Sequence, residues 1–232
     1  MKILKIIFCI IMSFITVFAF FITYRHNEFA VNSGSDKKPL LIIDAGHGGI
    51  DGGTQTIDGV LEKDINLSIA KKIAKLCDLY SVNYIMTRTS SDSLADETLD
   101  TIRQKKISDT KNRFEIIENN PQAIFLSIHQ NYFSQSKYKG AQVFYSPNNP
   151  LSLVLAETVQ KQIVNFLQPQ NNRIAKKTGT EIYLLYHAES VAIMVECGFL
   201  SNSEEADMLK SDSYQNKMAF AIFCGILKYM EA

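Results

Sequence analysis

Four polar residues of this sequence could together build a hydrolytic centre: His47, Glu62, His129 and Glu196. His47 lies in a glycine-rich turn after a short apolar run, His129 follows a second apolar run, and Glu196 ends a third. Glu62 stands at the expected start of a helix. Two imidazoles and one carboxylate recur as the ligands of catalytic zinc sites. His47, Glu62 and His129 are therefore candidate zinc ligands.

The fourth residue, Glu196, is the candidate acid/base catalyst. Three protein ligands leave one position on zinc for water, and zinc lowers the pKa of that water to about 7 while it polarises a carbonyl. A neighbouring acid can accept the proton of the water and later protonate a leaving amine. A carboxylate at the end of an apolar strand is costly to bury without a partner, which favours this role for Glu196.

Each of these residues also has an ordinary structural interpretation. The turn around His47 could bind a phosphate, but Asp51 stands where a dinucleotide-binding motif requires glycine, and no Gly-Lys-Ser/Thr follows. His47 could instead be a structural turn residue. Glu62 could complement a helix dipole, and Glu196 could pair with Arg173. The metal-site hypothesis therefore depends on the four residues acting together.

Apolar runs alternate with helical patterns along most of the chain. We expect strands over residues 40–43, 83–88, 123–128, 140–145, 181–186 and 191–196. We expect helices from about residue 61 and over 107–118, 151–167, 204–210 and 214–229, with loops over 89–105 and 168–179. This order predicts an α/β fold with a mostly parallel sheet, and the short connection between the third and fourth strands predicts one antiparallel pair. The carboxyl ends of parallel strands would gather the site residues at one edge.

The N-terminal segment has the features of an export signal. Residues 6–24 are largely apolar, with Lys2 and Lys5 before them and Arg25 and His26 after them. The run is about as long as a bilayer-spanning helix and no clear cleavage site follows, which favours an uncleaved anchor over a cleaved signal peptide. The lysines place the remainder outside the cytoplasm. We divide the chain into a signal anchor or signal peptide (1–26), a tether (27–38) and one catalytic domain (39–232).

Composition limits the partners and the type of metal site. The 232 residues include 24 basic and 24 acidic side chains, so the chain lacks the basic excess of a nucleic-acid-binding protein. The four cysteines are far apart and form no C-x-x-C pair, which argues against a disulfide framework or a thiolate zinc site. We interpret them as small buried apolar residues.

Several motifs, in order, resemble those of the zinc-dependent N-acetylmuramoyl-L-alanine amidases. They are DAGHGG (44–49), DGG (51–53), EKDIN (62–66), MTR (86–88), SIHQN (127–131) and VECGFLSN (195–202). The resemblance extends from about residue 40 to the end. It implies a mixed six-stranded twisted sheet flanked by helices, zinc ligands at His47, Glu62 and His129, and an acid/base at Glu196. The implied reaction is hydrolysis of the amide that joins the lactyl group of N-acetylmuramic acid to L-alanine in the peptidoglycan stem peptide.

Within this family the chain is similar to the germination-specific amidases of spore formers. The short anchored architecture, GAQVFY (140–145) and ILKY (226–229) carry this likeness. It implies removal of stem peptides from spore cortex towards muramic-δ-lactam, at the extracytoplasmic face of the membrane or in the wall, between the forespore membranes. The alternatives are a vegetative cell-wall autolysin, a zinc peptidase that cuts within the stem, and a non-catalytic peptidoglycan-binding module of the same fold.

A few positions depart from the family pattern or have no fixed role. Residues 189–191 (Glu-Ser-Val) stand where the family often has proline, and residues 146–179 lack the long inserted helix of autoinhibited relatives. We therefore expect no built-in plug, although an accessory protein could control activity. Asn131 and Arg113 could orient ligands or substrate, or could be ordinary polar residues. His26 and His187 are expected to be structural.

Overall fold

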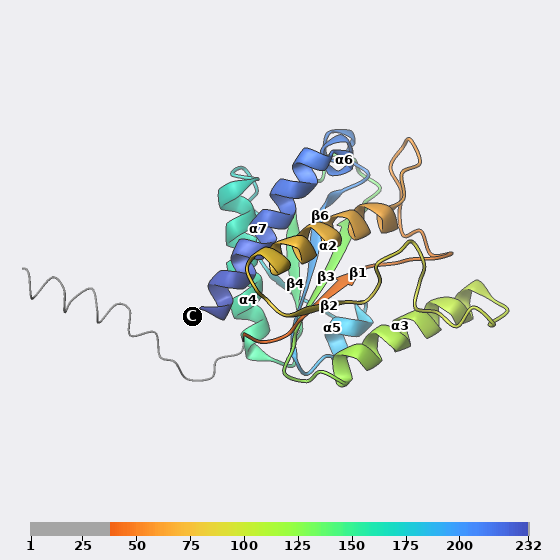
Figure 1. Ribbon diagram of the computed structural model, residues 1–232. Coiled ribbons are helices and arrows are strands. Elements are labelled where there is room, and N and C mark those ends of the chain that lie inside the picture. Colours follow the sequence, from red (N-terminus) through yellow and green to blue (C-terminus); the bar gives the residue numbers. More distant parts are fainter. Residues whose placement is uncertain (1–37, 232) are drawn as a thin grey trace, which may run out of the picture. The chain divides into compact units, whose positions relative to one another are not determined.

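Six strands of the computed structural model form one sheet, in the order β2-β1-β3-β6-β4-β5 (Figure 1). They are β1 (Leu41–Ala45), β2 (Tyr84–Met86), β3 (Ile124–Asn131), β4 (Gln142–Tyr145), β5 (Lys176–Lys177) and β6 (Val191–Phe199). Neighbouring strands are parallel except for β4 and β6. The prediction of a mixed, mostly parallel sheet is confirmed. The antiparallel partner of β4 is β6, however, and not the preceding β3, because β6 lies between them.

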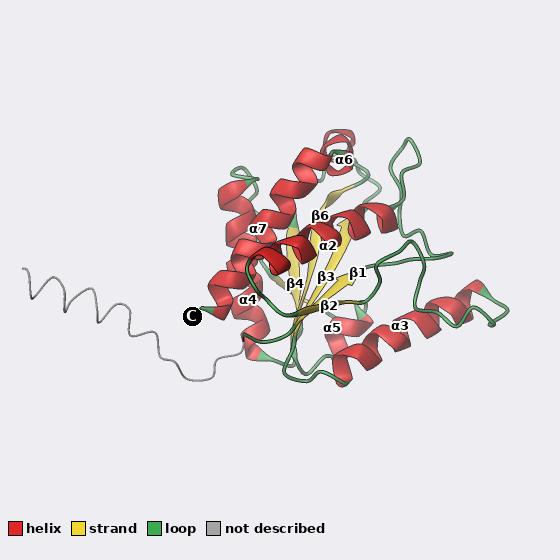
Figure 2. Cartoon of the chain, viewed as in Figure 1, coloured by secondary structure: helices red, strands yellow, loops and turns green. Residues whose placement is uncertain are grey.

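Helices cover both faces of this sheet (Figure 2). The helices α2 (Glu62–Leu79), α4 (Pro150–Phe166) and α7 (Asp212–Met230) pack on one face and share a large apolar core with it. The helices α3 (Ile102–Glu118) and α5 (Tyr183–His187) lie on the other face over a smaller apolar cluster. The helix α6 (Ser203–Lys210) precedes α7.

The central strands β1, β3 and β6 present different side chains to the two faces. Successive side chains of a strand point to opposite faces. On the α2/α4/α7 face the strand residues are apolar and fully buried to the end, as Ala45, Ile128 and Val195 show. On the α3/α5 face, apolar residues near the start of each strand give way to Asp44 in β1, Ser127 and His129 in β3, and Glu196 in β6. Functional groups therefore gather on the α3/α5 face at the carboxyl edge of the sheet.

Three secondary-structure predictions differ from the structure. Residues 181–186 were expected to form a strand, but Tyr183–His187 form α5, whose Leu184 and Leu185 pack onto the sheet. A short apolar run does not by itself distinguish a strand from a buried helical turn. The helix α3 begins at Ile102, inside an expected loop, because Thr101 and Gln104 form a capping box. The strand β5 also lies in an expected loop.

The structure describes residues 38–231, which belong to one contiguous unit of the chain. The expected signal anchor or signal peptide (1–26), and all of the tether (27–38) except Lys38, lie outside the described residues. Within the described range, no helix combines the length and the apolar character needed to cross a bilayer. Cys77 and Cys197 are buried free thiols, as expected, and Cys224 is half-buried.

Candidate active site

The loop after β1 holds His47 in a conformation that only a glycine-rich segment allows. His47 itself has a positive φ of 63°, and Gly48 and Gly49 have φ values of 145° and 55°. Non-glycine residues in this region are strained and are often found at functional sites. A side chain at Gly46 would overlap the ring of His129, so this glycine lets β1 and β3 bring their two imidazoles together.

Ligand atoms of His47, Glu62 and His129 converge within 4.8 Å of one another. Glu62 Oε1 lies 3.3 Å from His47 Nε2 and 3.0 Å from His129 Nδ1. The two imidazole rings meet edge to face, with centroids 4.9 Å apart and planes at 72°. The structure therefore brings together the three residues that the sequence analysis proposed as ligands, from β1, α2 and β3.

Glu62 is held rigidly at the start of α2, where it is 3 % exposed. Its Oε1 accepts hydrogen bonds from the backbone N–H of Gln130 and from Asn66 Nδ2, and its Oε2 accepts one from the backbone N–H of Thr54. Burial alone would raise the pKa of Glu62, but hydrogen bonds and charge from the two histidines hold it well below its usual range. Glu62 is therefore a carboxylate across the working pH range, as a metal ligand must be.

Asp51 fixes the orientation of His47. Its Oδ2 lies 2.9 Å from His47 Nδ1, and its Oδ1 lies 2.9 Å from Lys106 Nζ in α3. A carboxylate on one ring nitrogen fixes the tautomer and aims the other nitrogen at a metal. Burial would lower the pKa of His47, but Asp51 and Glu62 raise it to about 9. No role for Asp51 was predicted from the sequence, in which its position four residues after His47 was the available signal.

A buried ion pair supports the backbone of the same loop. Asp44 accepts hydrogen bonds from Ser127 Oγ at 2.6 Å, from Thr87 Oγ1 at 2.8 Å and from Arg113. Arg113 also donates to the carbonyl oxygens of Ala45 at 2.9 Å and His47 at 2.7 Å. Burial would raise the pKa of Asp44, but Arg113 and Ser127 lower it below its usual value. Arg113 is thus buried and touches the loop of a candidate ligand, although it does not touch the converging ligand atoms.

Two other predicted residues do not reach the site. Within residues 38–231, no hydrogen bond of the Asn131 side chain connects it to the candidate ligands, and its carbonyl oxygen accepts from Leu200 N–H. His187 lies on α5 among the rings of Phe114, Tyr183 and Tyr186, which agrees with a structural role. His26 lies outside the described residues.

Glu196 has a buried carboxylate oxygen, Oε2, that forms no hydrogen bond with any residue of the range 38–231. The pKa of Glu196 is raised to about 7. Burial is the largest cause, the charge of His129 lowers the pKa, and the charge of Glu62 raises it. Arg173 does not pair with it, because that guanidinium donates to Lys139 O and Gln142 Oε1 and lies over the Phe199 ring. A free carboxyl group with this pKa is suited to exchange protons near neutral pH.

Two of the three candidate ligands and Glu196 line one cavity. His47, His129 and Glu196 line a hollow of about 400 Å³, together with residues of α3 and α5. The register pairs His129 with Glu196 on adjacent strands. Two imidazoles beside a buried carboxylate form a set that a borderline divalent cation prefers, and the convergence of their ligand atoms fits such a cation. A mixed α/β sheet with this set next to an unpaired acid defines a metal-dependent hydrolase.

Comparison with known proteins identifies the family. The family model described as N-acetylmuramoyl-L-alanine amidase matches residues 41–228. The chain belongs to the N-acetylmuramoyl-L-alanine amidase family, whose members hydrolyse the amide between N-acetylmuramic acid and L-alanine in peptidoglycan.

Individual relatives are similar over most of their own length. The germination-specific N-acetylmuramoyl-L-alanine amidase of Bacillus subtilis is 32 % identical over 82 % of this chain and 79 % of its own. The CwlD amidase of Clostridioides difficile, solved in complex with the GerS lipoprotein, is 42 % identical, with a TM-score of 0.80 over 83 % of this chain and 98 % of that chain. The amidase AmiC2 of Nostoc punctiforme is 31 % identical, with a TM-score of 0.71 over 84 % and 98 % of the two chains.

Proposed function

We propose that the chain is a zinc amidase in which His47, Glu62 and His129 hold the metal and Glu196 is the catalytic acid/base. The observation that carries this proposal is the convergence of three ligand atoms within 4.8 Å, beside a carboxylate oxygen that has no hydrogen-bond partner among the described residues. A non-catalytic binding module of the same fold would have no use for an unpaired buried acid, since that arrangement costs stability.

The residues of the chain divide the reaction between them. When bound, zinc polarises the scissile carbonyl and makes a water molecule more acidic. Glu196 accepts a proton from the attacking water as the new C–O bond forms. Glu196 then gives this proton to the alanine nitrogen as the C–N bond breaks. The products are the carboxylate of the lactyl group and a stem peptide with a free L-alanine amine.

The supporting residues hold this geometry before substrate arrives. Asp51 keeps the Nδ1 side of His47 occupied, so that Nε2 faces Glu62. Arg113 donates a hydrogen bond to the carbonyl oxygen of His47 and so holds the loop in place. Such preorganisation lowers the cost of reaching the reactive arrangement.

We further propose a role in sporulation, at the extracytoplasmic side of a membrane. The support comes from the germination-specific relative and from CwlD, together with the apolar segment at residues 6–24. In this role the enzyme removes stem peptides from cortex muramic acid on the way to muramic-δ-lactam. An anchor over residues 1–26 and a tether over 27–38 would hold the domain near its substrate. Because CwlD was solved with a lipoprotein, an accessory protein is a further expected partner.

Mass spectrometry of digested muropeptides tests the reaction itself. An amidase releases stems that begin with free L-alanine and leaves glycan strands with unsubstituted lactyl groups. A peptidase that cuts within the stem leaves L-alanine attached to the sugar, and this result would overturn the proposed bond. Spores that lack the protein are expected to lose muramic-δ-lactam, whereas an unchanged cortex together with altered vegetative wall would assign the enzyme to growth instead.

Metal analysis of His129→Ala tests the ligand set. Loss of a direct ligand should lower zinc affinity by at least about 10-fold, since loss of supporting residues already costs about that much. The matched control is His187→Ala, which removes an imidazole that packs among aromatic rings of α3 and α5. Unchanged zinc content in folded His129→Ala would remove this residue from the set.

A further inference from the structure

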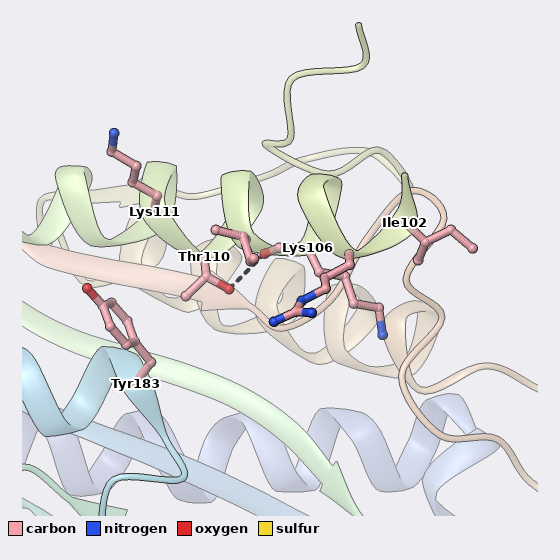
Figure 3. A pocket seen from close by; sticks show the side chains of 7 residues that line it. Ile102, Lys106, Thr110, Lys111 and Tyr183 are labelled. Carbon is pink, nitrogen blue, oxygen red and sulfur yellow. Dashed lines mark hydrogen bonds between the residues drawn. The ribbon is translucent and has the colours of Figure 1, made fainter. Parts of the chain in front are cut away.

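A groove between α3 and α5 adjoins the active-site cavity. It has a volume of about 890 Å³ and shares Lys106, Thr110 and Tyr183 with the lining of that cavity. Figure 3 shows Tyr183 of α5 facing α3, which carries Lys106 and Thr110. A substrate whose scissile amide lies at Glu196 can therefore extend into this α3–α5 groove.

The groove combines positive charge with exposed apolar side chains. Its cations are Arg103, Lys106 and Lys111, and its apolar side chains are Ile102, Ile107 and Tyr183. The three apolar side chains are about half exposed, at 54 %, 58 % and 48 % respectively. Within residues 38–231, neither Arg103 nor Lys111 forms an ion pair, whereas Lys106 pairs with Asp51. Two cations of the groove are therefore free to bind an anion.

The position of Arg103 on α3 is unfavourable for the helix itself. Arg103 is the second residue of α3, and the first turn holds no acidic residue. The amino end of a helix carries partial positive charge, so cations there destabilise it and acids are preferred. Residues that break a local rule without a structural gain are commonly functional. A negatively charged ligand at Arg103 would offset this unfavourable placement of charge.

We propose that the α3–α5 groove binds the anionic stem peptide of the substrate, with Arg103 and Lys111 pairing with its carboxylates. This inference rests on the proposed function, because it places the scissile amide at Glu196. The muramoyl carboxyl is consumed in the amide and the glycan is otherwise uncharged, so the free carboxylates of the substrate belong to the stem. The exposed Ile102, Ile107 and Tyr183 would contact the aliphatic parts of the same peptide. Lys106 ties the groove to the metal site through Asp51.

A charge-matched pair of double variants of the full chain tests the groove. One is Arg103→Gln with Lys111→Gln. The control is Lys71→Gln with Lys161→Gln, which removes two exposed cations of α2 and α4 that form no ion pair within the described part of the chain. The substrates are an N-acetylmuramoyl tripeptide with free carboxylates and its fully amidated counterpart. The groove variant should raise KM for the free acid about 5–10-fold and leave kcat within about twofold, as expected for the loss of two solvent-exposed charge pairs. KM for the amidated substrate should stay unchanged, and added salt should shrink the difference.

Either of two results would overturn the groove assignment: an unchanged KM for the free acid, or an equal loss for both substrates. Calorimetric binding of the free stem tripeptide to the same variants separates this proposal from the proposed catalysis, because binding needs no turnover. Binding that depends on Arg103 and Lys111 without any hydrolysis would keep the groove and refute the catalytic roles. Hydrolysis with charge-independent binding would keep the catalytic roles and refute the groove.

Discussion

The two faces of strands β1, β3 and β6 differ in the role of their residues: one face forms the apolar core and the other carries the candidate active site. On the α2/α4/α7 face, side chains such as Ile128 and Val195 are fully buried and apolar to the end of each strand. On the α3/α5 face, the adjacent residues His129 and Glu196 point into a cavity. One residue step along a strand thus separates a side chain that stabilises the fold from one that performs chemistry. We call the α3/α5 face the open face, because the cavity lies on it, and the α2/α4/α7 face the closed face, because it packs in the larger apolar core.

The substitution Glu196→Gln, on the open face, should give the largest effect, which is a loss of catalytic rate. It preserves shape and removes the proton-exchanging group, so kcat should fall by about 10²–10⁴-fold, the typical contribution of general acid–base catalysis. Zinc content and folded stability should be retained, because no other described side chain uses Oε2. Muropeptide turnover and metal analysis on the same preparation check this. A variant that keeps most of its rate would show that Glu196 is not the acid/base.

The neighbouring position on the closed face should behave in the opposite way. Ile128→Ala removes a fully buried side chain, which should lower the free energy of unfolding by about 2–5 kcal/mol. Folded molecules should still bind zinc with full stoichiometry, although His129 is the next residue. Chemical unfolding and metal analysis measure both quantities. If folded Ile128→Ala lost its zinc, metal binding on the open face would depend on packing on the closed face, and the contrast between the two faces would fail.

A third variant tests the support of the open face. Asp51→Asn removes the charge that holds His47 Nδ1, so zinc affinity should fall by about 10–100-fold, the usual cost of losing a residue that orients a ligand. The control Asp96→Asn changes an exposed acid on another loop and should leave affinity unchanged. Competition with a chelator measures the affinities. Equal affinities in both variants would mean that Asp51 does not orient His47.

The smallest expected effect is a pH dependence of the metal-free chain. Burial raises the pKa of Glu196 from 4.5 to about 7, so the folded state loses stability as pH rises through that range. Burial lowers the pKa of His47, but Asp51 and Glu62 more than offset this and raise it from 6.5 to about 9. Protonated His47 therefore stabilises the folded state fully below pH 6.5, and this contribution to the free energy of unfolding is lost as pH rises to 9. Both groups act in the same direction. Zinc needs an unprotonated His47, so its stabilising effect should grow with pH.

Thermal unfolding with and without chelator measures this dependence. The Tm of the metal-free chain should fall from weakly acidic to weakly alkaline pH, and Glu196→Gln should flatten the acidic half of the curve. The gap between the zinc-bound and metal-free forms should widen as pH rises. A metal-free chain that gains stability over this range would contradict the assigned environments of both residues.

The sequence predicted the parts of the site that follow from strand ends and helix starts. His47, His129 and Glu196 come after or within apolar runs, and parallel pairing brings such positions to one edge. It did not predict the contacts of Asp51, because a loop residue has no periodic pattern to reveal where its side chain points. The buried ion pair of Asp44 with Arg113 could not be predicted either, because it joins residues 69 positions apart in the sequence.

Errors in the fold arose where local patterns were ambiguous. The run over residues 181–186 is too short to show whether its period is that of a strand or of a helix, and packing of Leu184 and Leu185 decided in favour of α5. The start of α3 was misplaced although Thr101 and Gln104 have the spacing of a capping box. That error also hid the first turn of α3, which carries Arg103 of the groove.

Anomalous diffraction at the zinc edge, from crystals of the purified enzyme, tests the central claim most directly. We expect one strong peak within bonding distance of His47 Nε2, His129 Nδ1 and a Glu62 oxygen, with Glu196 beside it and not bound to it. A peak coordinated by other residues, or no peak in enzyme that is active on muropeptides, would contradict the account.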